Sequence, residues 1–281
     1  MIQLAVPNLR GKERAYLAQA VEQNWIGPEG PFVKRFEDMV AKAAGRKWAV
    51  ATITGTAALH VAAMVLGFAG KLVGVPRHAF PAARNVFNQM YCAVVLTDGG
   101  ECHDAQMYST GPWPMLCDRA PAIGEPPVDA QLECYSFAAN KIVTCGHGGA
   151  VVGDNDAHER QIRALIRQGQ GGGMFNYRMA NVNAALGCAQ MERLDELKAA
   201  KRRIWDRYAA RFPIPIMDRG PSRWMSTLNI KSDEGTLAAE LSAQDIETRM
   251  EPGGGLSLPC STGLSETDQD KVIEACGAFL R

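Results

Sequence analysis

The sequence predicts a mixed α/β protein whose large domain is built on a predominantly parallel sheet. Short apolar runs alternate with helical patterns over the first two thirds of the 281 residues, which is typical of strands joined by helices. A composition of 47% hydrophobic and 21% charged residues suits a chain that buries a substantial core. From Phe212 onward the chain turns proline-rich and its elements shorten, so a second, smaller α+β domain is expected.

Five apolar runs are the expected strands of the large domain: residues 47–53, 71–75, 93–96, 115–117 and 150–152. The first run leads directly into an apolar helix expected over residues 57–66. An amphipathic helix is expected over residues 156–167.

A long helix is expected from about Ala180 to Tyr208, after the glycine-rich stretch 169–173, because its apolar residues recur at helical spacing. It leads into the second domain, so we expect a large domain over residues 1–205 and a small one over 206–281.

The small domain is expected to hold a strand over residues 223–230 and a helix within residues 236–250. Its last helix should open at Ser265, because Asp268 follows three residues later in a near relative of the capping box.

Charge and cysteine usage exclude several classes of protein. Thirty basic and thirty acidic residues leave no net charge, so a nucleic-acid partner is disfavoured. The N-terminus lacks the pattern of a signal peptide, and no apolar stretch is long enough for a membrane span. The cysteines include no CxxC pair, which favours a reduced, cytoplasmic protein without a structural zinc site; they are Cys92, Cys102, Cys117, Cys134, Cys145, Cys188, Cys260 and Cys276. The run Cys102, His103 and Asp104 is not expected to bind a metal ion.

Three places carry residues suited to chemistry. In ITGTAALH a strand ends at Thr54, Gly55 and Thr56 where a helix begins, and exposed N–H groups at such a junction favour a phosphate. The junction is also common in any α/β protein. No P-loop and no complete GxGxxG motif occurs, so neither an NTPase nor a dinucleotide enzyme is supported.

Lys141 lies between an apolar run and a glycine-rich turn. A partly desolvated lysine has a lowered pKa and can act as a Schiff-base nucleophile or a general base, although most lysines are solvated surface groups. Asp118 ends an expected strand, where α/β sheets present catalytic groups, although a carboxylate there can also cap a helix.

Several stretches occur together and in order: TGTAALH at 54–60, VPRHAF at 75–80, SFAANKIVTCGHGG at 136–149 and NYRMANVNAALGCAQMERLDE at 176–196. They resemble the motifs SGTAAL, VPxxTF, SFNxxKxxTxGEGG and NYRMxxxxAAxGxxQLxxLDE of one family. This is the DegT/DnrJ/EryC1/StrS family of fold type I pyridoxal-phosphate-dependent sugar aminotransferases. The likeness runs almost from end to end, and the tail is similar to aminotransferases of the legionaminic-acid and bacillosamine type.

The resemblance implies a role for each matching residue. Lys141 would be the Schiff-base lysine and proton shuttle, and Asp118 the partner of the pyridinium nitrogen of pyridoxal 5'-phosphate. Phe80 would stack on the cofactor ring, although ordinary core packing is the alternative. The cofactor phosphate would be held by Gly55, Thr56 and Ser136. Asn176, with Arg178 beside it, would reach across the interface of a homodimer.

The chain also departs from the family. It is markedly shorter, it lacks a histidine-bearing loop before Phe175, and it skips a segment after Arg249. Pro121 stands where a polar residue is usual beside the cofactor, and His147 stands where glutamate is common. The residues matched to the cofactor are thus kept, whereas the loops on the substrate side are trimmed.

The resemblance implies a ping-pong reaction. Glutamate would convert the cofactor to pyridoxamine 5'-phosphate, and a nucleotide-linked keto-deoxysugar, 4-keto before 3-keto, would then take the amino group. A dehydratase of the same family is the nearest alternative, but that variant replaces the lysine by histidine, so Lys141 argues against it. A catalytically silent regulatory protein that keeps the fold is the alternative from another class.

Overall fold

The computed structural model describes residues 1–77, 79–97, 105–107 (backbone), 116–167, 174–217, 222–230, 233–251 and 254–280. These residues form two compact units: Leu9–Leu194, and Asp195–Arg281 together with Met1–Asn8. The expected boundary at 205/206 lies inside the helix α7 (Leu194–Arg211). Ile204 and Tyr208 of that helix pack in the core of the C-terminal unit.

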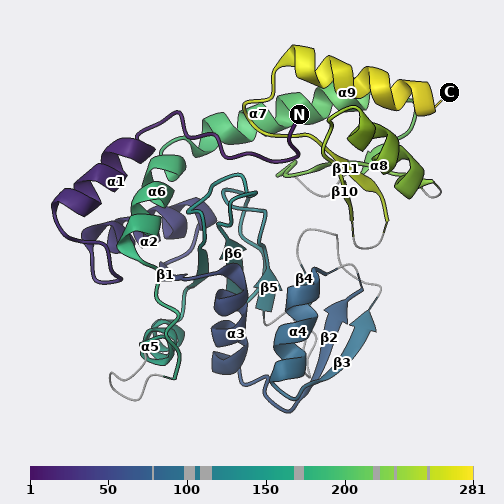
Figure 1. Ribbon diagram of the computed structural model, residues 1–281. Coiled ribbons are helices and arrows are strands. Elements are labelled where there is room, and N and C mark those ends of the chain that lie inside the picture. The colour runs from purple at the N-terminus through teal and green to yellow at the C-terminus, as the bar shows by residue number, and fades with distance from the viewer. Residues whose placement is uncertain are drawn as a thin grey trace. The chain divides into compact units, whose positions relative to one another are not determined.

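The first unit contains a five-stranded sheet in the order β1-β7-β6-β5-β4 (Figure 1). Its strands are β1 (Trp48–Thr52), β4 (Ala105–Met107), β5 (Leu116–Asp118), β6 (Leu132–Ser136) and β7 (Gly149–Gly153). The sheet is mixed: β1, β5 and β6 share one direction, whereas β7 and β4 run against their neighbours. The α/β class is thus confirmed, but the antiparallel β7 separates β1 from β6. Residues 137–148 join β6 to β7 as a loop without a helix that returns the chain beside β6, whereas a parallel neighbour is usually reached through a helical crossover.

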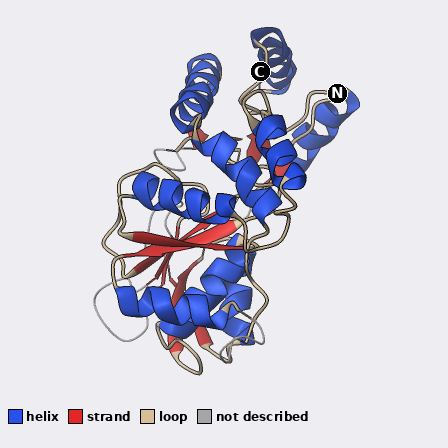
Figure 2. Ribbon diagram, turned by 90° about the vertical axis from the view of Figure 1, so that its left-hand side faces the viewer, coloured by secondary structure: helices blue, strands red, loops and turns tan. Residues whose placement is uncertain are grey.

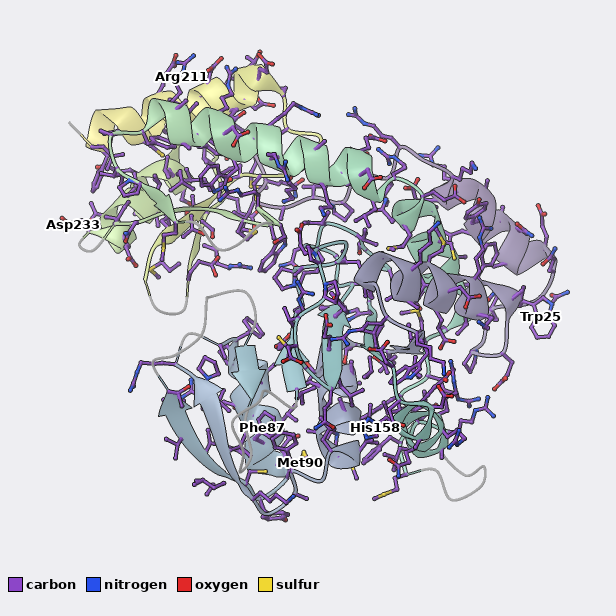
Figure 3. All side chains as sticks on the ribbon, turned by 180° about the vertical axis from the view of Figure 1, so that it is seen from behind. Trp25, Phe87, Met90, His158, Arg211 and Asp233 are labelled. Atoms are coloured by element: carbon purple, nitrogen blue, oxygen red, sulfur yellow. The ribbon has the colours of Figure 1, made fainter. Side chains whose placement is uncertain are left out.

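A parallel pair of strands, β2 (Leu72–Pro76) and β3 (Ala93–Thr97), is joined through the helix α4 (Pro81–Gln89). The other helices of this unit are α1 (Glu13–Glu22), α2 (Pro31–Ala44), α3 (Gly55–Val65), α5 (Asp156–Leu165) and α6 (Asn181–Met191). Helices lie on both sides of the strands (Figure 2), and every residue of β1 and β7 is buried. The core between α3, α4 and the strands includes Phe87 and Met90, which lie close together in Figure 3.

The structure confirms all five expected strands within a residue or two, as well as the helices that follow β1 and β7. The expected strand 115–117 is observed at Leu116–Asp118, and Met115 lies outside the described residues. So do the run 102–104 and the glycine-rich stretch 169–173. The strand β6 did not stand out in the sequence, because Glu133 interrupts its apolar pattern.

The single long helix expected over 180–208 is wrong: α6 ends at Met191 and α7 begins at Leu194. Glu192, at the break, accepts a hydrogen bond from the Tyr16 hydroxyl (2.6 Å) and forms ion pairs with Lys12 and Arg35. Neither glycine nor proline marks the break, so the helical periodicity continues through it.

The C-terminal unit holds an antiparallel sheet in the order β10-β11-β9-β8. Its remaining elements are β8 (Ile216–Met217), β9 (Ser226–Leu228), α8 (Glu234–Ala243), β10 (Arg249–Met250), β11 (Leu256–Leu258) and α9 (Glu266–Phe279). The expected cap is confirmed, because the Ser265 hydroxyl accepts a hydrogen bond from the Asp268 N–H (3.0 Å) and donates one to its carboxylate (2.8 Å). The N-terminal residues join this unit through hydrogen bonds such as Ile2 N–H to Asp245 O (2.6 Å). None of the described helices combines the length and apolar character that a bilayer crossing needs.

Candidate active site at the end of β1 and β6

Small residues form a cradle where α3 begins. Thr54 caps the helix by accepting a hydrogen bond from the Ala57 N–H (3.0 Å), so the expected strand-to-helix junction is confirmed. A Cβ atom on Gly55 would stand 2.8 Å from the Ser136 Cβ, which puts Gly55 and Ser136 in direct contact. Thr56 is exposed beside them. N–H groups at a helix N-terminus with a hydroxyl alongside suit a phosphate group.

Gly149 lies directly beneath this cradle. It pairs with Thr52 of β1 and with Ser136 of β6. A Cβ atom there would stand 2.3 Å from the Thr54 carbonyl oxygen and 2.5 Å from the Gly55 nitrogen. Only glycine therefore lets the start of α3 approach β7 so closely.

We expect Gly149→Ala to destabilise the protein by about 2–4 kcal/mol, because backbone atoms would have to move to admit the methyl group. Thermal unfolding measures the loss, and phosphate or cofactor affinity should fall with it. Gly277→Ala in α9 is the matched control, since nothing lies within 4 Å of the new Cβ. A Gly149→Ala protein as stable as that control would contradict the described approach of the two backbones.

Asp118 lies at the end of β5, half-buried, and pairs with Cys134 of β6, two residues before Ser136. Its Oδ1 accepts a hydrogen bond from the Ala120 N–H (3.1 Å). Burial, followed by the nearby Asp118 charge, holds the pKa of the Cys134 thiol well above its usual value. The register therefore places the Asp118 carboxylate and Ser136 on neighbouring strand ends.

Lys141 lies in the loop that joins β6 to β7. The Phe137 N–H donates to Gly148 O (2.8 Å), the Cys145 N–H donates to Phe137 O (2.9 Å), and the Lys141 N–H donates to Ala138 O (3.0 Å). The Phe137 ring packs edge-on against Phe36, with 5.0 Å between ring centroids. These bonds hold the shape of the loop that carries Lys141, a half-buried residue.

The segment 174–179 runs along the end of β1. The backbones of Arg178 and Thr52 form an isolated antiparallel β-bridge there, and the Ile53 N–H donates to Tyr177 O (2.8 Å). Arg178 forms an ion pair with Glu29 of the same chain. Asn176 is exposed, and its backbone forms an isolated antiparallel β-bridge with that of Arg167. The structure thus brings Arg178 to the end of β1, beside the junction into α3.

An aromatic contact that the sequence did not single out holds this segment on α3. The His60 Nδ1 lies 3.2 Å from the Tyr177 hydroxyl, and Phe175 stacks on Tyr177 with 4.9 Å between centroids. Burial lowers the pKa of His60. The spacing of His60 from Gly55 along the helix was visible in the sequence, but its partner lies more than a hundred residues away.

Phe80 is the N-cap residue of α4 and is 66% exposed. Its stacking on a cofactor ring stays a prediction.

A separate polar hollow lies in the same unit, between α2, α5 and the start of β1. Its charged side chains pair with one another, for example Arg163 with Glu159 (2.9 Å), and none of the predicted site residues reaches it. It is lined by Lys34, Asp38, Lys47, Trp48, Ala49, Glu159 and Arg163.

The described residues fit pyridoxal phosphate: Gly55, Ser136 and Gly149 lie so close together that a Cβ atom on either glycine would clash, and the N–H groups at the start of α3 suit the phosphate. A carboxylate and a lysine lie on the adjoining strand end and loop.

Comparisons with known proteins place this geometry in a family. The GDP-perosamine synthase of Caulobacter vibrioides is 27% identical over 368 aligned positions, covering 99% of this chain and 98% of the relative. Because the chain has only 281 residues, it aligns with extensive internal gaps, as expected of a shortened member.

Among solved structures, Spr1654 from Streptococcus pneumoniae in its PLP form has a TM-score of 0.86 at 18% identity, with 100% of both chains covered. DesI, solved in the presence of its TDP-sugar product, has a TM-score of 0.84 at 20% identity, covering 100% of this chain and 92% of DesI. These likenesses establish the fold.

The sequence description of the DegT/DnrJ/EryC1/StrS aminotransferase family matches residues 7–101 and 128–251. Lys141 and the motifs around Gly55, Ser136 and Arg178 lie inside the matched ranges, whereas Asp118 lies in the interval between them and rests on the strand register instead. The chain belongs to the DegT/DnrJ/EryC1/StrS aminotransferase family.

Proposed function

We propose that this chain is a pyridoxal-phosphate-dependent aminotransferase that moves an amino group from glutamate to a nucleotide-linked keto-deoxysugar, most readily a 4-keto sugar. The observation that carries the proposal is the cradle of Gly55, Ser136 and Gly149 at the start of α3, with Asp118 on the next strand end. The family supports the aminotransferase activity.

Each site residue has a defined task in this proposal. The N–H groups of Gly55 and Thr56 and the Ser136 hydroxyl bind the phosphate, and Phe80 covers the ring. Lys141 anchors the cofactor and moves the proton of the substrate carbon. The Asp118 carboxylate keeps the ring nitrogen protonated, and the bound cofactor then supplies an electron sink.

The sugar substrate is supported by two similar proteins, a GDP-perosamine synthase and DesI, which was solved in the presence of its TDP-sugar product. The assignment to the legionaminic-acid or bacillosamine type of sugar aminotransferase rests on the C-terminal sequence alone. We also place the enzyme in the cytoplasm, because the seven described cysteines are buried free thiols.

A catalytically silent protein that keeps the fold is the second candidate, and the shortened chain favours it. Purified protein should carry the yellow colour of bound cofactor if the first proposal holds. Nucleotide-linked 4-keto and 3-keto sugars should then be screened with glutamate as donor. Bound cofactor without amination of any of these sugars would favour the silent candidate.

The shared site of a homodimer is tested by mixing variants. We propose that Asn176, which is exposed in its own chain, completes the partner subunit's pocket. Lys141→Ala and Asn176→Ala should each be severely impaired alone. A mixed dimer then has one pocket with both defects and one intact pocket. Random reassortment makes about half of the dimers mixed, so activity should return to roughly a quarter of wild type. No recovery after verified subunit exchange would refute the shared site.

A further inference from the structure

A buried network of charges lies directly behind Asp118. Side chains alternate along a strand, so Glu133 and Tyr135 of β6 face away from the side that carries Cys134 and Ser136. Asp118 pairs with Cys134, which places the next residue, Arg119, on the Glu133 side. Glu133 and Tyr135 are fully buried, and Arg119 is 2% exposed.

Arg119 reaches three acceptors from this position. Its Nη1 donates to a Glu133 carboxylate oxygen (2.9 Å), to Pro126 O (2.8 Å) and to the Tyr135 hydroxyl (3.3 Å). The Tyr135 hydroxyl donates to the same Glu133 oxygen (2.7 Å). Burial, followed by the Glu133 charge, raises the pKa of Tyr135, so the phenol stays protonated as a donor.

The second carboxylate oxygen of Glu133 accepts a hydrogen bond from a different arginine. Arg46, which follows α2, donates from Nε to Glu133 (2.7 Å), from Nη1 to Asp154 (2.8 Å) and from Nη2 to Val128 O (2.6 Å). One buried carboxylate is therefore shared by two arginines. Arg119 adjoins Asp118 in the chain, whereas Arg46 contacts the segment that enters β6.

The end of β5 is paired on both sides, since Asp118 lies opposite Ala105 of β4 and Cys134 of β6. The strand has three residues, and beyond Asp118 the ladder continues only through Arg119 N–H to Cys134 O (2.8 Å) and a longer Ser136 N–H to Ala120 O (3.4 Å) among the described hydrogen bonds. Arg119 ties this end both to β6, through Glu133, and to the following loop, through Pro126 O. Buried charge-assisted hydrogen bonds are strong and directional.

We propose that Arg119 is a positioning residue for Asp118: its bonds to Glu133 and Pro126 hold the end of β5 so that the carboxylate stays aimed at the cofactor ring. The contact of Asp118 with the cofactor ring rests on the proposed function. The restraint of β5 by Arg119 does not depend on that function.

The test compares Arg119→Met with Arg46→Met, which removes the other guanidinium from the same carboxylate. Both variants should lose thermal stability, because each leaves part of a buried charge network unpaired.

In the cofactor-loaded protein only Arg119→Met should raise the midpoint of the pH titration of cofactor absorbance, by roughly one pH unit. The reason is that displacing the Asp118 charge lowers the positive charge on the ring, which makes protonation elsewhere on the cofactor easier. Arg119→Lys keeps the charge and should restore part of the wild-type midpoint.

A second readout needs no cofactor. Hydrogen exchange of a peptide covering residues 116–122 should be about tenfold faster in Arg119→Met than in wild type, and close to wild type in Arg46→Met. Equal behaviour of the two methionine variants in both measurements would overturn the proposal. A wild-type protein without cofactor absorbance would instead refute the proposed function, and the exchange comparison would still decide whether Arg119 restrains β5.

Discussion

Lys141→Ala is expected to abolish turnover, with a loss of at least about 10⁴-fold, because one substitution removes both the covalent anchor of the cofactor and the group that moves the proton. The fold should survive. The loop is held by the backbone hydrogen bonds of Phe137, Cys145 and Lys141 itself, and Asn183 Nδ2 on α6 donates to Cys145 O (2.7 Å). None of these bonds uses the lysine side chain.

The measurement is single-turnover conversion of the loaded enzyme with glutamate. Borohydride treatment of the wild-type protein should fix the cofactor on the peptide that contains Lys141. Lys42→Ala, an exposed lysine on α2, is the control and should keep wild-type rate and labelling. A label that maps to another lysine would show that Lys141 is not the anchor.

Asp118→Asn is expected to slow the half-reaction with glutamate by about 10²- to 10³-fold or more, because a neutral amide cannot hold the proton on the ring nitrogen. The amide oxygen can still accept the Ala120 N–H bond that the carboxylate accepts. The variant should therefore fold and bind the cofactor, and the loss should appear in the rate constant.

Asp38→Asn on α2 is the matched control, since that carboxylate is 63% exposed and pairs only with the nearby Lys34 among the described ion pairs. An unchanged half-reaction rate in Asp118→Asn would mean that another group contacts the ring nitrogen. This result matters because Asp118 lies outside the residues that the family description matches.

Much of the secondary structure could be predicted from short runs of residues. The apolar runs predict β1, β2, β3 and β7. For β1 and β7 the reason is that a strand buried on both faces reads as a continuous apolar stretch, whereas β2 and β3 keep an apolar run although they are partly exposed. Ser265 and Asp268 predict the start of α9 because a capping box is a contact between near neighbours in the chain. The same periodicity misplaced α6 and α7 as one helix. At the break Glu192 contacts Tyr16, Lys12 and Arg35, which are all distant in sequence, and no nearby residue marks it.

The sequence by itself determined the family motifs, the class of fold and the identity of Lys141 and Gly55 as candidates, since these depend on short runs of residues. Only the tertiary structure decided the direction of β7, the contact of Gly55 with Ser136, and the approach of Gly149 to the start of α3. It also placed Arg119 against Glu133 behind Asp118. The physical reason is common to all of them: strand pairing and buried charge contacts join residues far apart in the chain, and no local spacing encodes which of them will meet.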